Sequence, residues 1–160
     1  MDRLILTLGT LAFCVVGYLL MAHGWRSRVR RQRDLPVPPV SNGSARVTAG
    51  GVPGLYVGTT AAGDWLDRIV THGLSDRATG ELCVAEDGVH VLRDGLPEVF
   101  VPRTDLTGVT IEQALAGKVV STGMLVLTWR LGEHEVATAF RADDPAAHTR
   151  LRDALLEAAA

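Results

Sequence analysis

The sequence has only two cysteines among its 160 residues, Cys14 and Cys83. Cys14 lies within a long hydrophobic stretch and Cys83 within a β-like run, so the two are too differently placed to form a disulfide framework. This cysteine usage is compatible with a reducing compartment. Lysine is also scarce. Lys118 is the only lysine, whereas the sequence has fifteen arginines. We interpret that ratio as a compositional bias without functional meaning.

Nucleotide-binding motifs are missing as well. A P-loop requires phosphate-cradling glycines followed by Lys and then Ser or Thr. Here Gly117-Lys118 is followed by Val119, and Glu112 occupies the position of the first glycine. The glycines between residues 50 and 58 have no lysine near them, so turns or strand packing explain them better.

The sequence also lacks hydrolase and metal-binding patterns. The segment from Gly73 to Arg77, with His72 before it, lacks the second glycine of a nucleophile elbow, and triad residues converge from separate elements. The histidines show no metal-ligand spacing to cysteine or to one another; they are His23, His72, His90, His134 and His148. We therefore expect no catalytic residue, no cofactor, no metal and no enzymatic activity.

Charge is distributed very unevenly along the chain. Residues 1–40 hold six arginines against two aspartates, a net charge of +4, so the remainder carries −6 because the whole chain carries −2. Nucleic acids and anionic lipids repel a domain of that charge. We expect no nucleic-acid partner and no binding of phosphoinositide by the domain.

A long hydrophobic run is present at the N-terminus. The nineteen residues Leu4–Ala22 carry no charge, and as a helix they would span about 28 Å, close to the hydrocarbon thickness of a bilayer. Only a helix satisfies the backbone of a lone membrane-crossing segment. The sequence therefore predicts a transmembrane anchor over residues 1–25, with the span itself at about 4–22.

Basic residues flank this run on one side. Arg3 alone precedes it, whereas five arginines form a basic collar directly after it: Arg26, Arg28, Arg30, Arg31 and Arg33. A cleaved signal peptide would place its basic charge before the apolar stretch. Because arginines mark the cytoplasmic flank, we predict a single-pass protein of the cytoplasmic membrane with its N-terminus outside. The collar either orients the chain only or also attracts anionic lipid, by about 1 kcal/mol per Arg.

A proline-rich linker follows the collar. Leu35–Val40 contains three prolines, which favour an extended polyproline II segment of about 20 Å. We assign residues 26–45 to the collar and linker and residues 46–160 to one cytoplasmic domain.

Short apolar runs separated by turns predict a mainly β domain. Glu81–Ala85 and Val89–Arg93 flank Glu86-Asp87-Gly88, which predicts a hairpin, and Glu98–Pro102 follows as a third strand. Three further runs are predicted as strands: 108–112, 124–131 and 135–141. In the second of these, Leu125, Leu127 and Trp129 alternate with more polar residues, as in a strand with one buried face.

Two helices are predicted beside these strands. The first begins at Asp64 and ends at Gly73, although a strand is the alternative there. The second has Asp144 as its cap and Pro145 in its first turn. Its apolar residues recur at helical spacing and predict one buried face: Ala147, Leu151, Ala154, Leu155 and Ala158. Strands followed by such a helix predict a split barrel that the helix caps.

Several segments together carry a family resemblance. Gly54–Ala78 (GLYVGTTAAGDWLDRIVTHGLSDRA), Ala116–Val120 (AGKVV) and Val126–Gly132 (VLTWRLG) resemble actinobacterial single-span membrane proteins with a bacterial pleckstrin-homology-like (PH-like) domain. The resemblance covers nearly the whole chain, including the apolar span and the linker. It implies an N-terminal transmembrane helix and a mainly β, PH-like split barrel capped by a C-terminal helix. It supplies no catalytic residue.

The function that fits these features is a membrane-anchored, cytoplasmic interaction or scaffolding module with a protein partner. The alternative is an accessory subunit of a transport or cell-envelope membrane complex. Arg68 and Arg77 flank His72, so these three are the candidate partner-binding residues, although solvated charge is the commoner role of such side chains. We expect Trp65 and Trp129 to pack in the core.

Overall fold

The computed structural model describes residues 2–41, 43, 46–115 and 118–159. It divides the chain into two compact units, Met1–Asp34 and Leu35–Ala160. We describe each unit by itself.

The first unit is one long helix, α1, over Asp2–Arg31. Its segment Leu6–Ser27 has a mean hydropathy of 1.8, and none of it is buried by the rest of the chain. Length and composition therefore suffice for crossing a membrane. Two hydroxyls within α1 donate to the carbonyl four residues earlier, Thr7 to Arg3 and Thr10 to Leu6, so the helix satisfies them internally. The helix continues through most of the collar because arginine favours helix and the first proline is Pro36.

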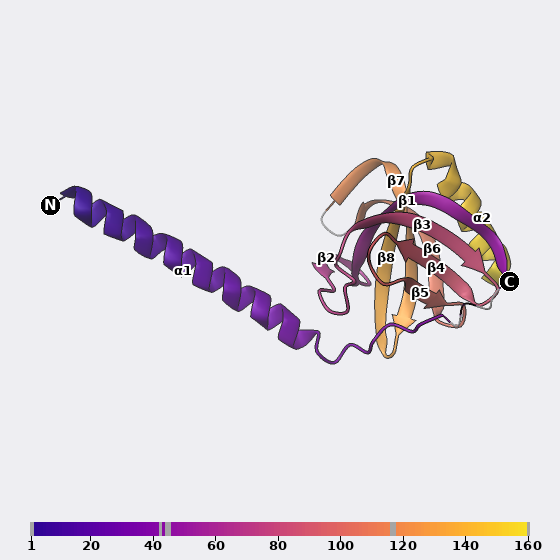
Figure 1. The fold of residues 1–160 in the computed structure, drawn as a ribbon, viewed down its shortest axis with the longest axis horizontal. Coiled ribbons are helices and arrows are strands. Elements are labelled where there is room, and N and C mark those ends of the chain that lie inside the picture. Colours follow the sequence, from indigo (N-terminus) through magenta and orange to yellow (C-terminus); the bar gives the residue numbers. More distant parts are fainter. Residues whose placement is uncertain (1, 42, 44–45, 116–117, 160) are drawn as a thin grey trace. The chain divides into compact units, whose positions relative to one another are not determined.

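The second unit is an open antiparallel sheet with one helix (Figure 1). The strands follow the order β5-β4-β3-β1-β8-β7-β6, and β2 pairs with β1. Their bounds are β1 Val47–Ala61, β2 Asp64–Arg68, β3 Ala78–Ala85, β4 Gly88–Arg93, β5 Val99–Pro102, β6 Leu106–Leu115, β7 Lys118–Leu131 and β8 His134–Ala142, and the helix α2 covers Pro145–Ala159. This architecture confirms the predicted split barrel with a C-terminal helix, and the predicted hairpin lies between β3 and β4.

Strand β1 is the element that the sequence patterns did not identify. It pairs with β2, β3 and β8, and its pairing shifts in register at several points, including between Tyr56 and Gly58. Such irregularities bend a strand and increase its twist. Gly58 has φ +143°, and a Cβ there would lie 2.5 Å from Nη2 of Arg68. Only glycine therefore suits this bend.

The predicted helix from Asp64 to Gly73 is wrong, because the residues form strand β2 and a loop. Asp64 does not cap a helix; its Oδ1 accepts a hydrogen bond from the backbone N–H of Leu66, 3.0 Å away, as in an Asx turn. Trp65 is 42% exposed, so its predicted place in the core is also wrong. Trp129 is fully buried, as predicted.

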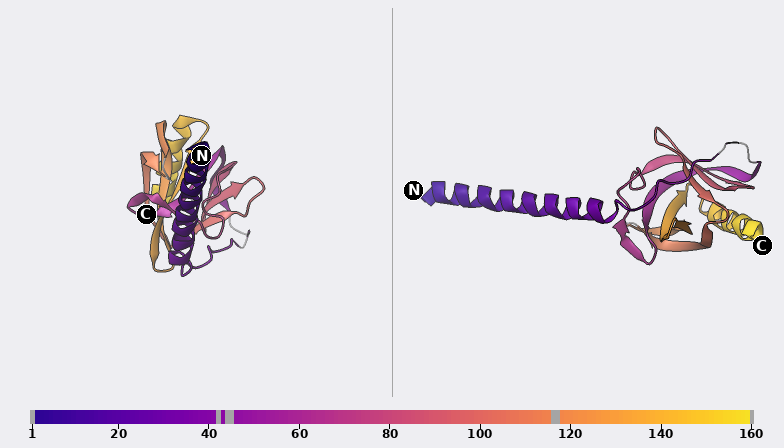
Figure 2. Two further views of the ribbon diagram at one scale, coloured as in Figure 1. Left: turned by 90° about the vertical axis from the view of Figure 1, so that its left-hand side faces the viewer. Right: turned by 90° about the horizontal axis from the view of Figure 1, so that it is seen from below.

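The core lies between the inner face of the sheet and α2, which the two views place at one end of the sheet (Figure 2). Ala147, Leu151 and Leu155 are buried there together with Leu125, Leu127, Trp129 and Phe140. Ala154 is half-buried, and the side chain of Ala158 is outside the described residues. Asp144 caps the helix as predicted, because its Oδ1 accepts from the N–H of Ala146 at 3.0 Å.

A buried histidine attaches α2 to the neighbouring strand. His148 is 2% exposed, and its Nε2 accepts a hydrogen bond from the backbone N–H of Ala142 in β8, 2.9 Å away. Burial lowers the pKa of His148, which keeps that nitrogen free to accept. The ring thus supplies a hydrogen-bond acceptor for the backbone N–H of Ala142 at the end of β8.

We expect Leu151→Ala to lower the free energy of unfolding by about 2–5 kcal/mol, because it leaves a cavity between α2 and the sheet. Leu156→Ala on the same helix is the matched control, since Leu156 is 51% exposed. Chemical denaturation of the full chain, followed by the signal of buried Trp129, measures both. An unchanged midpoint for Leu151→Ala would contradict the packed helix.

Candidate functional site

Arg68, at the end of β2, is used by the fold itself. Its Nη2 donates to two backbone carbonyls, that of Val57 at 2.6 Å and that of Ser75 at 3.0 Å. The guanidinium thereby joins the bend in β1 to the loop that precedes β3. Its predicted role in binding a partner stays a prediction, but the structure gives these donors an internal use.

His72 and Arg77 lie on the same loop with different surroundings. His72 adopts a left-handed conformation, with φ 57°, and its Nε2 is 3.0 Å from the carbonyl oxygen of Leu35. Arg77 is exposed. The three residues of the predicted cationic notch therefore differ in their surroundings. Arg68 is half-buried, whereas His72 and Arg77 are exposed. Arg68 and His72 form hydrogen bonds with backbone carbonyl groups.

The contact with His72 also places the start of the linker. Leu35 packs against the core, and Pro36 lies so close to Gly132 that a Cβ on that glycine would be 2.9 Å from Cγ of the proline. The first two residues of the predicted extended linker thus lie on the domain, and the assignment of residues 26–45 to the collar and linker stays a prediction. The predicted domain start at residue 46 falls after them.

A chain of buried hydroxyls fixes the loop from inside. The indole N–H of Trp129 donates to Oγ1 of Thr138 at 2.9 Å, Thr138 and Thr59 share a bond of 2.8 Å, and Thr59 and Tyr56 share another of 2.8 Å. Tyr56 donates its single proton to the carbonyl of Leu74, 2.7 Å away. Each hydroxyl has one proton to give, so Thr59 must donate to Tyr56 and Thr138 to Thr59.

Arg93 in β4 also contacts the loop before β3 and the ring of Tyr56. It is only 6% exposed, lies 4.8 Å from the ring centroid of Tyr56 and donates to the carbonyls of Gly73 and Pro97 at 2.7 and 2.8 Å. Burial raises the pKa of Tyr56 to about 12, although the bond from Thr59 and the charge of Arg93 oppose the rise. The phenol is therefore neutral at any physiological pH.

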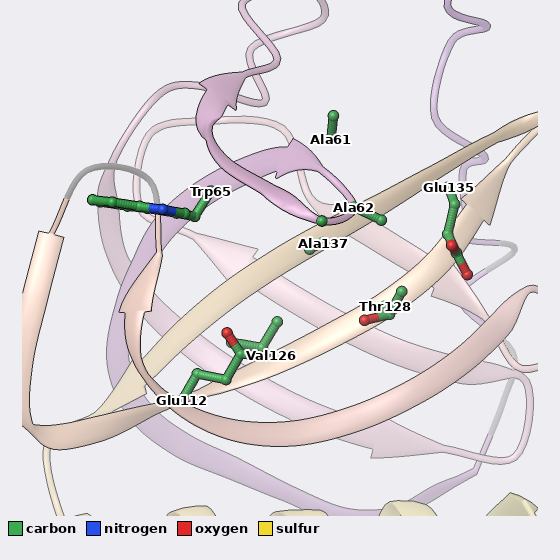
Figure 3. A pocket seen from close by; sticks show the side chains of 9 residues that line it. Ala61, Ala62, Trp65, Glu112, Val126, Thr128, Glu135 and Ala137 are labelled. Carbon is green, nitrogen blue, oxygen red and sulfur yellow. The ribbon is translucent and has the colours of Figure 1, made fainter.

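The opposite, outer face of the sheet carries a pocket of about 330 Å³ (Figure 3). Its walls come from the β1–β2 turn, β2, β6, β7 and β8, and its lining residues are Ala61, Ala62, Gly63, Trp65, Glu112, Val126, Thr128, Glu135 and Ala137. Figure 3 shows Trp65 and Glu135 on opposite sides, with Thr128 and Val126 between them. Two of the lining residues, Val126 and Ala137, also belong to a small second core with Val57, Met124 and Ala139.

The pocket is acidic. Oε1 of Glu135 accepts from the hydroxyl of Thr107 at 3.1 Å, and Oε1 of Glu112 accepts from that of Thr110 at 3.0 Å. Arg130 faces Glu135 across the β7–β8 pairing, and its Nη2 lies 3.5 Å from the carbonyl oxygen of Thr104. The walls thus combine two carboxylates, each positioned by a threonine hydroxyl, with one exposed aromatic ring.

The collar belongs to the other unit. Arg26 and Arg33 are exposed, whereas the side chains of Arg28, Arg30 and Arg31 are outside the described residues. Among the residues that the structure describes, no group of three or more His, Cys, Asp and Glu could hold a metal ion.

Comparison with known families identifies the class of protein. The family model for the bacterial PH domain-like proteins matches residues 32–156, and the chain belongs to that family. The matched region begins before Leu35, the linker residue that packs against the core. No curated protein matches the chain. PH-like domains are typically non-enzymatic interaction modules.

Little in the sequence indicates the outer pocket. Its aromatic and acidic residues, Trp65, Glu112 and Glu135, lie on three different strands, and only the register of those strands brings them to one face. The one available signal was Trp65, a large aromatic residue between two aspartates, Asp64 and Asp67.

We expect Arg68→Met to lower the free energy of unfolding by about 1–3 kcal/mol, because the carbonyls of Val57 and Ser75 lose their donor. Arg77→Met, on the exposed part of the same loop, removes the same charge and should change stability by less than about 0.5 kcal/mol. Thermal unfolding of the full chain in detergent compares the two. If both variants melted like the parent, Arg68 would not be the connector that its contacts indicate.

Proposed function

We propose that this protein is a membrane-tethered, PH-like module that faces the cytoplasm and docks a protein partner without catalysing a reaction. The observation that supports this most strongly is the pairing of two separate units. One is an apolar helix, Leu6–Ser27, that the rest of the chain leaves uncovered. The other is a compact domain with a core of its own. An uncovered apolar helix of that length matches the hydrocarbon thickness of a bilayer.

The direction of insertion follows from the arginines. Five follow the apolar segment and one precedes it, and this asymmetry retains the arginine-rich side in the cytoplasm. It is also the reverse of the charge order in a signal peptide, so we propose that the helix stays as an anchor.

The charge of the domain limits the class of partner. Residues 41–160 carry −6, and the outer pocket adds two carboxylates at one place. Anionic headgroups and nucleic acids would be repelled at that surface. We therefore propose a protein partner and expect no binding of phosphoinositide by the domain.

A reporter fused after Ala160 should be active only in a cytoplasmic assay, and the intact mass should include residues 1–25. Replacing the five collar arginines with glutamine should yield mixed orientations, because the topological signal is lost. Arg3→Gln is the control and should leave the orientation unchanged. An extracytoplasmic signal from the parent chain, or a mass showing cleavage after the apolar segment, would refute the anchoring.

Exchanging the span separates the proposed module from an accessory subunit. We expect replacement of residues 4–22 with an unrelated apolar helix to preserve partner capture, because the domain makes the contacts. Cross-linking in intact membranes and mass spectrometry would identify the partner with each version. Loss of the same partner on span exchange would instead favour an accessory subunit of a transport or cell-envelope complex, whose helix makes the specific contact.

A further inference from the structure

The outer pocket has the composition of a site for an organic cation. Its lining includes the carboxylates of Glu112 and Glu135 and the ring of Trp65. Carboxylates form the strongest hydrogen bonds with charged donors, and the face of an indole attracts a cation. Val126 and Ala137 line the pocket beside Thr128, and these apolar side chains suit the carbon stem of a long charged side chain.

Other small ligands fit this pocket less well. A phosphate or carboxylate would meet two like charges, which disfavours it. A hard metal ion needs several oxygen ligands close together, whereas the lining combines two carboxylates with an indole ring. A volume of about 330 Å³ lies at the small end of the ligand-pocket range, about 300–1,000 Å³, and so suits one side chain.

The polar groups at the pocket are already in position. Thr107 and Thr110 hold the carboxylates of Glu135 and Glu112 through hydroxyl bonds. Thr60 pairs with Ala137 in the β1–β8 register, so its side chain is on the same face of the sheet as the pocket floor. The Oγ1 of Thr60 is buried and has no hydrogen-bond partner within the described part of the chain. Thr60 is 0% exposed and is not one of the residues that line the pocket, so this hydroxyl lies beneath the pocket and not in its wall.

We propose that the pocket binds an arginine side chain presented by the protein partner. A guanidinium is planar, stacks on an aromatic ring and donates in pairs to a carboxylate, whereas an ammonium is a compact, strongly hydrated point charge. Trp65 supplies the ring, and Glu112 and Glu135 supply the acceptors. The identity of the partner rests on the proposed function; the pocket itself does not.

The test uses the full chain in nanodiscs of neutral lipid and N-acetyl-arginine amide as the probe. Heteronuclear NMR follows the backbone amides of Gly63 and Thr128, which line the pocket. The arginine probe should produce saturable shifts that weaken as salt increases. N-acetyl-citrulline amide, which has the same shape without the charge, should bind at least about tenfold more weakly. Equal binding of the two would overturn the proposal.

Variants then locate the binding. Glu112→Gln and Glu135→Gln should each weaken the arginine probe by about tenfold, and Trp65→Leu should weaken it likewise. Glu133→Gln is the matched control, because it removes one exposed charge from the β7–β8 turn outside the pocket. The indole N–H signal of Trp129 reports whether each variant keeps its core. If Glu133→Gln weakened binding as much as Glu135→Gln, the overall field of the domain would be responsible and the pocket would be refuted.

A lysine probe tests the choice of arginine. N-acetyl-lysine amide should bind several-fold more weakly, because it cannot stack or donate in pairs, and equal affinity would overturn the assignment to guanidinium. This experiment measures the pocket alone. Its failure would leave the proposed topology unchanged, and a failed topology test would not alter the result at the pocket.

Discussion

The buried hydrogen-bond chain from Trp129 to Leu74 is the constraint on which the rest of the domain depends. Its members come from β7, β8, β1 and the loop before β3. In an apolar core, each of these groups would cost about 1–3 kcal/mol without a partner. Because every hydroxyl has one proton to donate, moving any one element would leave a group unsatisfied. The chain therefore sets both the sheet register and the position of the loop.

The position of the loop determines the contacts of three basic side chains. With Leu74 held by Tyr56, the neighbouring carbonyls of Gly73 and Ser75 face the guanidinium groups of Arg93 and Arg68. Two arginines that would otherwise be solvated thus become connectors within the fold. His72, held in a left-handed conformation beside Gly73, faces outward and reaches Leu35. Residues that appear as a basic surface cluster in the sequence have mostly structural contacts.

The extent to which the sequence predicted the fold follows from how local each signal is. The β3–β4 hairpin and α2 were identified because a tight turn and a capped apolar stripe are local patterns. Strand β1 was missed because its bends at Gly51 and Gly58 interrupt the alternation of apolar and polar residues. Asp64 misled the prediction because an aspartate starts helices and Asx turns equally well. Only the pairing with Ala61 decides between them.

The site was less predictable than the fold for a related reason. Arg68, His72 and Arg77 are near one another in sequence, so they were easy to group, but proximity along the chain does not determine what a side chain contacts. Trp65, Glu112 and Glu135 are far apart in sequence, and they meet through the order of strands in the sheet. A single sequence contains no direct record of that order.

The packing of Leu35 on the core limits how far the domain can travel. The helix ends at Arg31 and the domain begins at Leu35, so the chain between them can extend to about 14 Å at most. If the helix is the membrane anchor that we propose, this short connection would confine the domain to a thin layer at the membrane surface. A partner would then meet the domain within that layer, where the local concentration of a second membrane-bound protein would compensate for a weak individual contact.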